Sequence, residues 1–251
     1  MDPRIGLLKA FYRGLPKDRA KLETEEHGFA FLAQLLSDGT VLEYGELTLS
    51  GLLHKYKLAR IPEARMDEHL AAHIGKTRNL CLYFDDRAND LFCFNLDNKQ
   101  LADSSALIPE MKFAVRRLED SLRGAGCEPL IVASGRGYHV WCRLDGAVAN
   151  ERLHAFMLRA GVATAAALHR AGYDRHRVKF NFYPDPRARD VVSLRLFGSL
   201  HARNKVFSRV LAPTGLLDEA TSWEYFADYL KNKTIPVARF HAACDAVAPP
   251  A

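Results

Sequence analysis

The sequence contains few cysteines, and none of them stands in a spacing that is typical of a metal site. Only five of the 251 residues are Cys, no two of them form a C-x-x-C pair, and the ten His residues include no H-E-x-x-H pattern. These absences argue against a structural zinc site. Three of the cysteines lie in apolar, strand-like contexts, where a reduced cysteine behaves as a small hydrophobic residue.

Long apolar runs are also missing. No run approaches the length that a membrane span requires, and the N-terminal residues mix acids with bases instead of showing a signal-peptide layout. Because 48% of the residues are hydrophobic, the chain can still bury one substantial core or two modest ones. We therefore expect a soluble, cytoplasmic protein that has no membrane partner.

Positive charge is concentrated in one part of the chain. The formal net charge is only +5, but residues 170–209 contain ten Lys and Arg residues against three acids. Six Tyr and Phe residues interleave with these bases. A basic segment with aromatic residues is typical of nucleotide or nucleic-acid binding, although a solvated basic face without a ligand would have the same composition.

The N-terminal region looks mostly helical. Apolar residues at intervals of three and four predict a series of helices there. These helices cover residues 5–12, 20–36, 50–57 and 66–74. From about residue 76 the pattern changes to short β-type runs separated by turns and longer helices. We therefore expect two domains, a helical N-terminal region over residues 1–75 and a mixed domain over 76–251.

The second region contains strands and helices in mixed order. The strands are expected over residues 79–84, 91–97, 129–133, 138–144, 178–183, 191–197 and 206–211, and the helices over 108–124, 151–171 and 222–231. The first two strands are separated only by a turn, so they are expected to form a hairpin. This order predicts an α+β fold around a mixed or antiparallel sheet.

A polar segment with two glycines separates two of these strands. Residues 134–141 read Ser-Gly-Arg-Gly-Tyr-His-Val-Trp. The glycines permit backbone conformations and close approaches that side chains would block. Phosphate oxygens could then meet backbone N–H groups together with Ser134, Arg136 and His139. The alternative is a hairpin whose polar residues have no ligand.

Two polar residues stand at the end of an expected strand. Strand alternation puts Asn95 and Asp97 on the same face, where their oxygens could hold a hard cation such as Mg²⁺ or Mn²⁺. Two carboxylates would offset more of the cation's charge than one carboxylate and one amide do. The alternative is an Asx turn that closes the strand, since Asn98 and Lys99 follow.

Further polar residues fall within the basic segment. Asn181 alternates with the aromatic residues on either side of it, so it faces away from them. Later in the segment, an arginine on a strand is followed by a Gly-Ser turn, a histidine and two more cations, a set suited to phosphate recognition. These residues are Arg195, His201, Arg203 and Lys205.

Taken in this order, the motifs resemble the catalytic core of the archaeo-eukaryotic primases, a superfamily that includes the primase-polymerases. The resemblance spans roughly residues 69–210. Its most specific part is the segment 134–141, which looks like the family's Ser-x-His motif on a strand. The resemblance implies a DNA polymerase or primase of the kind used in DNA replication, which joins nucleotides along a template.

The resemblance also implies roles for individual residues. In that family, acids on two strands hold two Mg²⁺ or Mn²⁺ ions, which align the primer hydroxyl with the incoming triphosphate. By position, Asn95, Asp97 and Asn181 take the catalytic places, and Asn95 and Asp97 are the metal ligands. The nucleotide-binding residues are then Ser134, Arg136, His139, Arg195 and His201, and the nucleic-acid-binding residues are Arg203 and Lys205.

The implied partners are nucleoside triphosphates and single-stranded or primed DNA, or RNA. A helicase or another replication, repair or defence protein is common around such domains. Two of the three expected acids are asparagines here, and an amide oxygen offers a metal only a dipole where a carboxylate offers a full charge. The chain is therefore either a metal-dependent nucleotidyltransferase or a degenerate relative that serves as a nucleotide or nucleic-acid binding module. A basic α+β domain with a different ligand remains a third interpretation.

Overall fold

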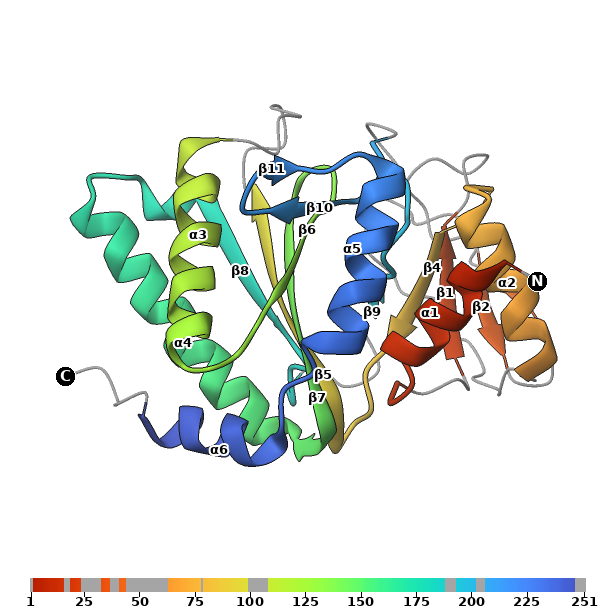
Figure 1. Ribbon diagram of the computed structural model, residues 1–251, viewed down its shortest axis with the longest axis horizontal. Helices are drawn as coiled ribbons and strands as arrows, with labels where there is room; N and C mark the ends of the chain where they lie inside the picture. Colours follow the sequence, from red (N-terminus) through yellow and green to blue (C-terminus); the bar gives the residue numbers. More distant parts are fainter. Residues whose placement is uncertain are drawn as a thin grey trace.

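The computed structural model describes residues 2–15, 19–23, 33–36, 41–43, 63–77, 79–98, 108–187, 193–201 and 206–246. In this part of the chain, two β-sheets lie side by side along the long axis of the molecule, with helices packed around them (Figure 1). None of the described helices is both long enough and apolar enough to cross a membrane.

The larger sheet has six strands in the order β11-β10-β6-β7-β5-β8. They are β5 (Ala88–Asn98), β6 (Leu130–Ala133), β7 (Gly137–Ala149), β8 (Val178–Tyr183), β10 (Arg209–Ala212) and β11 (Gly215–Leu216). Every neighbouring pair is antiparallel. With the helices that accompany it, this sheet confirms the expected α+β class and its antiparallel sheet.

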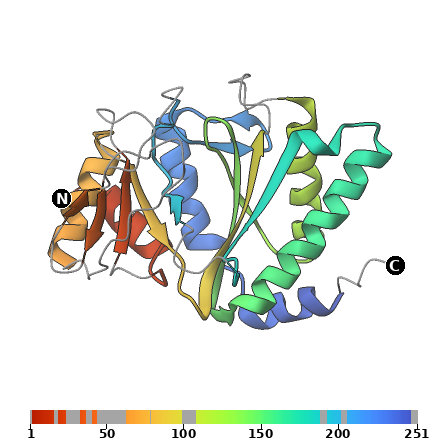
Figure 2. The same cartoon turned by 180° about the vertical axis from the view of Figure 1, so that it is seen from behind.

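Three helices pack on one face of this sheet (Figures 1 and 2). They are α3 (Pro109–Gly124), α4 (Asn150–Arg170) and α6 (Val237–Ala246). In α3 the buried residues Met111, Val115, Leu118 and Leu122 recur at intervals of three and four, which places them along a single stripe of the helix. That stripe lies against the sheet and closes the first hydrophobic core.

The smaller sheet has five antiparallel strands in the order β3-β2-β1-β4-β9. They are β1 (Arg19–Glu23), β2 (Ala33–Leu36), β3 (Val41–Glu43), β4 (Asn79–Tyr83) and β9 (Ser193–Arg195). A 3₁₀ helix, η1 (Arg175–Arg177), precedes β8, and the remaining helices are α1 (Pro3–Phe11), α2 (Glu63–Ile74) and α5 (Glu219–Asn232). Side chains of α1, α2 and α5 form a second hydrophobic core with both sheets.

The second core joins residues that are far apart in the sequence. The ring of Phe11 on α1 lies 6.0 Å from that of Trp141 on β7 and 4.9 Å from that of Phe226 on α5. The backbone N–H of Phe197 donates to the hydroxyl oxygen of Tyr12 at 3.0 Å. The N-terminal helix is therefore part of the same packed core as the larger sheet.

The N-terminal region is only partly helical. The helices expected over residues 5–12 and 66–74 are present, but the helix expected over 20–36 is wrong, because β1 and β2 lie there. Polar and apolar residues alternate along β1, which is the period of a strand, and pairing with β4 favours that form over a helix. Residues 50–57 lie outside the described part of the chain.

The hairpin expected from the strands at 79–84 and 91–97 is wrong as well. β4 pairs with β1 and β9, whereas β5 pairs with β7 and β8 in the other sheet. Side-chain hydrogen bonds hold the connection open: Asn89 accepts from the N–H of Asp85 at 3.0 Å and donates to Asn150 at 2.7 Å. β5 has eleven residues and β7 has thirteen, so the two strands can pair along most of their length.

The strand expected over 178–183 is present with the expected ends, the other expected strands and helices are present with shifted ends, and α6 is an element that the sequence patterns did not predict. The division into two domains near residue 75 stays a prediction. Pairing between β1 and β4 crosses that position, as does the second hydrophobic core.

Candidate nucleotide-binding site

The candidate site residues on β5, β7 and β8 lie on the face of the larger sheet opposite α3, α4 and α6, which we call the site face. Along β5, Phe92, Phe94 and Leu96 belong to the helix-covered core. Because successive residues of a strand point to opposite faces, Asn95 and Asp97 point to the site face. The structure thus places both residues on one face of a strand, as strand alternation predicted.

Antiparallel pairing brings residues of three strands together on the site face. Asn95 lies opposite His139 of β7 on one side and opposite Asn181 of β8 on the other. Asp97 lies opposite Lys179 of β8. Residues opposite each other in neighbouring strands share a face and lie close enough for their side chains to interact. The three positions at which the resemblance expects acids therefore meet at one point.

Asp97 is the acceptor at the centre of this group. Its Oδ2 accepts from the Nδ2 of Asn95 at 3.2 Å and from the Nδ2 of Asn181 at 3.5 Å. The guanidinium of Arg136 lies 3.7 Å from its Oδ1. The Oδ1 of Asn95 is buried and has no hydrogen-bond partner among the described residues. The carboxylate thus faces N–H groups and a cation, and one amide oxygen is left for a ligand or a water molecule.

A tight turn joins β6 to β7. The N–H of Ser134 donates to the backbone oxygen of Gly137 at 2.8 Å, and Gly135 has a φ of 97°. A positive φ at the first central position is typical of a type II′ hairpin turn and favours glycine. A Cβ on Gly137 would collide with the backbone oxygen of Leu96 on β5. The geometry of the hairpin explains why both positions are glycine, so the hairpin interpretation is correct for the backbone.

The hairpin alone does not require the polar side chains of this segment. Arg136 is half-buried beside Asp97, and His139 is buried with its ring edge-on to Trp141, at a centroid distance of 6.0 Å. Burial, with smaller contributions from the charges of Arg195 and His201, lowers the pKa of His139 to about 3. Its imidazole is therefore neutral at neutral pH and can offer a ligand a hydrogen bond but no charge.

Arg195 at the end of β9 and His201 in the segment after it lie near His139. Arg195 ends β9, and His201 follows after a turn and is only 6% exposed. Both lie close enough to His139 to affect its pKa. The structure thus brings together Arg195, His201 and His139, which are spread over more than sixty residues of sequence. Arg203 and Lys205 lie outside the described residues.

His73 on α2 has a structural role beside this group. Its Nδ1 accepts from the backbone N–H of Leu80 at 3.0 Å, and its Nε2 lies 2.9 Å from the backbone oxygen of Phe197. Burial lowers the pKa of His73 to about 4, so the neutral ring that these two contacts require is present at neutral pH. The ring fixes α2 to β4 and to the segment after β9.

The residues of the site face do not fit a two-metal centre. No group of three His, Cys, Asp or Glu residues that could hold a metal occurs in the part of the chain that the structure describes. Asp97 is a single carboxylate between two amides, with N–H donors and a guanidinium directed at it. Two divalent ions at close range would lack charge compensation there. The expected Mg²⁺ or Mn²⁺ therefore has no matching set of ligands.

Lys179 is a site residue that the sequence patterns did not single out, because it is one of ten cations in the basic segment. Lys179 and Asn181 share a face because β8 has the two-residue period of a strand, so the pattern could have linked them. The position opposite Asp97 depends on the register between β5 and β8, which the sequence alone does not contain.

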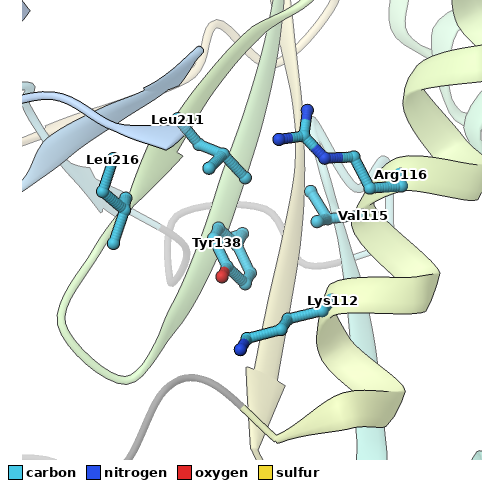
Figure 3. Close-up of a pocket in the computed structure, with 6 residues that line it drawn as sticks. All are labelled: Lys112, Val115, Arg116, Tyr138, Leu211 and Leu216. Carbon is cyan, nitrogen blue, oxygen red and sulfur yellow. The ribbon is translucent and has the colours of Figure 1, made fainter. Parts of the chain in front are cut away.

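A pocket of 280 Å³ lies on the helix-covered face instead (Figure 3). It is lined by Lys112, Val115, Arg116, Tyr138, Leu211 and Leu216. Tyr138 and His139 are neighbours on β7, so their side chains point to opposite faces of the sheet. The pocket is therefore separate from the site face.

No family model matches the chain, and no curated protein matches it at a significant level. Among solved structures, the chain is similar to the polymerase domain from Mycobacterium tuberculosis Ligase D, in complex with DNA. The TM-score is 0.46 and the identity 14%, over 97% of this chain and 86% of that chain. The likeness concerns the fold alone. That domain belongs to the superfamily that the motifs resemble, but a TM-score of this size carries no argument about activity.

Proposed function

We propose that this chain is a binding module for nucleotides and nucleic acid on a primase-polymerase-like core, and that it does not transfer nucleotides. The observation that carries the proposal is the charge of the site face. Within the described residues, Asp97 is the carboxylate at the place where β5, β7 and β8 meet, with Arg136 beside it and Lys179 opposite it. Arg195 lies near the neutral His139. Such a face is complementary to phosphate oxygens and leaves few ligands for a metal.

The functional groups suit a phosphate ligand in different ways. The guanidinium of an arginine can donate to two phosphate oxygens at once, and the ammonium of a lysine adds a point charge. The neutral ring of His139 and the free amide oxygen of Asn95 offer hydrogen bonds without charge. A ligand with several phosphates and with hydroxyl groups, such as a nucleoside triphosphate, uses both kinds of group.

Binding of a fluorescent nucleoside triphosphate and of a short single-stranded DNA, followed by anisotropy at low salt, tests this proposal. We expect saturable binding that Arg195→Gln weakens by about tenfold, because a hydrogen-bonded charge on the phosphate is lost. Arg117→Gln is the matched control, since Arg117 is an exposed arginine on α3, outside the basic segment and on the helix-covered side. If the chain binds neither ligand, the proposal is wrong.

Metal-dependent, template-directed nucleotidyl transfer is the second candidate function. The observation that favours it is the convergence of Asn95, Asp97 and Asn181 on adjacent strands, at the positions where the resemblance expects three acids. Because two of the three residues are neutral amides, this candidate function requires one weakly bound ion to replace the two ions of the expected mechanism.

Primer extension and de novo priming with Mn²⁺, using both deoxynucleotides and ribonucleotides, separate the two functions. A binding module makes no product. Product from the natural chain that Asp97→Ala abolishes would establish nucleotidyl transfer. A gain of product in a variant with Asn95→Asp and Asn181→Asp would show that these two positions can form the metal site that the present residues do not.

A further inference from the structure

The environment of Asp97 is positive, although it is the acid at the point where three strands meet. Arg136 lies 3.7 Å from one of its oxygens, and Lys179 lies opposite it in the neighbouring strand. Two amide N–H groups, from Asn95 and Asn181, point at its other oxygen. The charge of the carboxylate is thus already balanced by groups of the protein.

These contacts are of a kind that a ligand can displace. The distance of 3.7 Å between Arg136 and Asp97 is too long for a hydrogen bond, and the two side chains are 32% and 22% exposed. Lys179 is exposed. The Nε of Arg136 is buried and has no hydrogen-bond partner within the described residues. Because no hydrogen bond holds the guanidinium to Asp97 at 3.7 Å, its partly exposed end can turn to an anion without breaking one.

A second observation points to a ligand at the same place. Asn95 is only 8% exposed, and its Oδ1 has no partner in the described part of the chain. A buried oxygen of this kind is normally satisfied by a donor, because an unpaired polar atom costs free energy. A ligand hydroxyl or a water molecule next to the phosphates would supply that donor.

We propose that this site binds the phosphate groups of its ligand without a divalent metal, and that Arg136 and Lys179 supply the positive charge that a metal would otherwise bring. The inference rests on the proposed function, since it concerns how the same site binds phosphate. The phosphates of a triphosphate and those of a nucleic-acid backbone share this chemistry, and both are included in the test.

Electrostatics gives the sign of the expected metal effect. A cation on Asp97 would lie beside Arg136 and opposite Lys179, where like charges repel. In addition, Mg²⁺ bound to a triphosphate cancels part of its negative charge and weakens its attraction to these two residues. The uncomplexed triphosphate is therefore the form that this site prefers, which is the opposite of what a metal-dependent site requires.

The first experiment measures the affinity of a fluorescent nucleoside triphosphate at constant ionic strength, in EDTA and in excess Mg²⁺. We expect binding in EDTA, weakened several-fold by Mg²⁺. A parallel titration with single-stranded DNA, and competition by inorganic triphosphate in each, shows which source of phosphate the site takes. Binding that appears only with Mg²⁺ would overturn the inference and leave the proposed function standing. No binding under either condition would overturn the proposed function itself.

The second experiment uses a substitution whose effect has opposite signs under the two mechanisms. Asp97→Asn keeps the shape of the side chain and removes its negative charge. Without a metal, this change frees Arg136 and raises the affinity, by about threefold to tenfold. At a metal site the same change would remove the principal ligand and lower the affinity.

The cations are tested with a matched control. Arg136→Gln and Lys179→Gln should each lower the affinity in EDTA by about tenfold, whereas Arg117→Gln on α3 should leave it within about twofold. Circular dichroism and thermal unfolding of each variant show whether the fold is retained. If folded Arg136→Gln and Lys179→Gln both bind as tightly as the natural chain, these residues do not replace the metal and the inference is wrong.

Discussion

The two faces of the six-stranded sheet are made from alternate residues of the same strands, yet they have different tasks. On the helix-covered face, β5 contributes Phe92, Phe94 and Leu96, which are fully buried. On the site face of the same strand, Asn95 and Asp97 are polar and hydrogen-bond to each other. The two-residue period of a strand thus lets one segment support packing and binding at once.

The site face itself changes character along β7. At one end, Arg143 is buried, pairs with Asp90 at 3.0 Å and donates to the backbone oxygen of Phe11. At the other end, Arg136 and Asp97 are partly exposed. Phe11 of α1 covers Arg143, since its ring lies 5.9 Å from the guanidinium, whereas the side chains of Arg136 and Asp97 keep about a third and a fifth of their surface exposed. Charged residues on one face are therefore structural where a helix covers them and available to a ligand where none does.

The largest expected effect is the loss of stability when packing on the helix-covered face is disrupted. Phe94→Ala should lower the free energy of unfolding by about 3–5 kcal/mol, because it removes a fully buried ring that packs against Phe182 at a centroid distance of 5.9 Å. Its neighbour on the opposite face is the matched control: Asn95→Ala should lower it by only about 1 kcal/mol. Urea unfolding followed by circular dichroism measures both. Equal losses of unfolding free energy would contradict the conclusion that one face serves packing and the other serves binding.

An intermediate effect concerns the buried histidines around the site face. Between pH 7.5 and pH 5.5 we expect the free energy of unfolding to fall by about 3 kcal/mol. Burial lowers the pKa of His73 to about 4 and that of His139 to about 3, against the ordinary value of 6.5. Between these values the unfolded chain binds more protons than the folded chain, so protons favour unfolding as the pH falls.

Urea titrations at both pH values measure this fall. His139→Gln should reduce it to about half, since each buried histidine contributes about 1.4 kcal/mol at one unit below its ordinary pKa. His176→Gln, at an exposed position on η1, should leave it unchanged. A fall that is the same in all three proteins would mean that His139 is not the group that titrates.

The smallest expected effect on stability concerns the turn beside the site face. Arg136→Gln should change the free energy of unfolding by less than about 0.5 kcal/mol, because its ion pair with Asp97 is long and partly exposed. In the same turn, Gly135→Ala should lower it by about 1 kcal/mol, since Gly135 has a positive φ. Urea unfolding of both variants is the measurement. A larger loss for Arg136→Gln than for Gly135→Ala would make Arg136 a structural residue.

Local patterns were sufficient where an element is stabilised mainly by its own residues. The stripe of α3 and the alternation of β8 are visible in the sequence and present in the structure. They were insufficient for the N-terminal strands, where the alternation along β1 is short and the pairing partner β4 lies more than fifty residues away. They also failed for β4 and β5, because a short turn between two strands suggests a hairpin whichever sheet each strand joins.

The candidate site shows the same limit. That Asn95 and Asp97 share a face follows from the strand period, and that Gly135 and Gly137 are needed follows from a tight hairpin. The arrangement of Lys179 opposite Asp97 depends instead on register, which hydrogen bonds between distant segments set. The same is true of Arg195, which a different sheet carries to the site.

The sequence by itself determined the faces of the strands, the glycine turn and the asparagines at two of the three positions where the resemblance expects acids, because these depend on residue type and on local backbone geometry. Only the tertiary structure decided which residues meet at Asp97 and that its surroundings are positive. Packing of two sheets against shared helices sets those distances, and electrostatic interactions depend on distance between charges rather than on their separation along the chain.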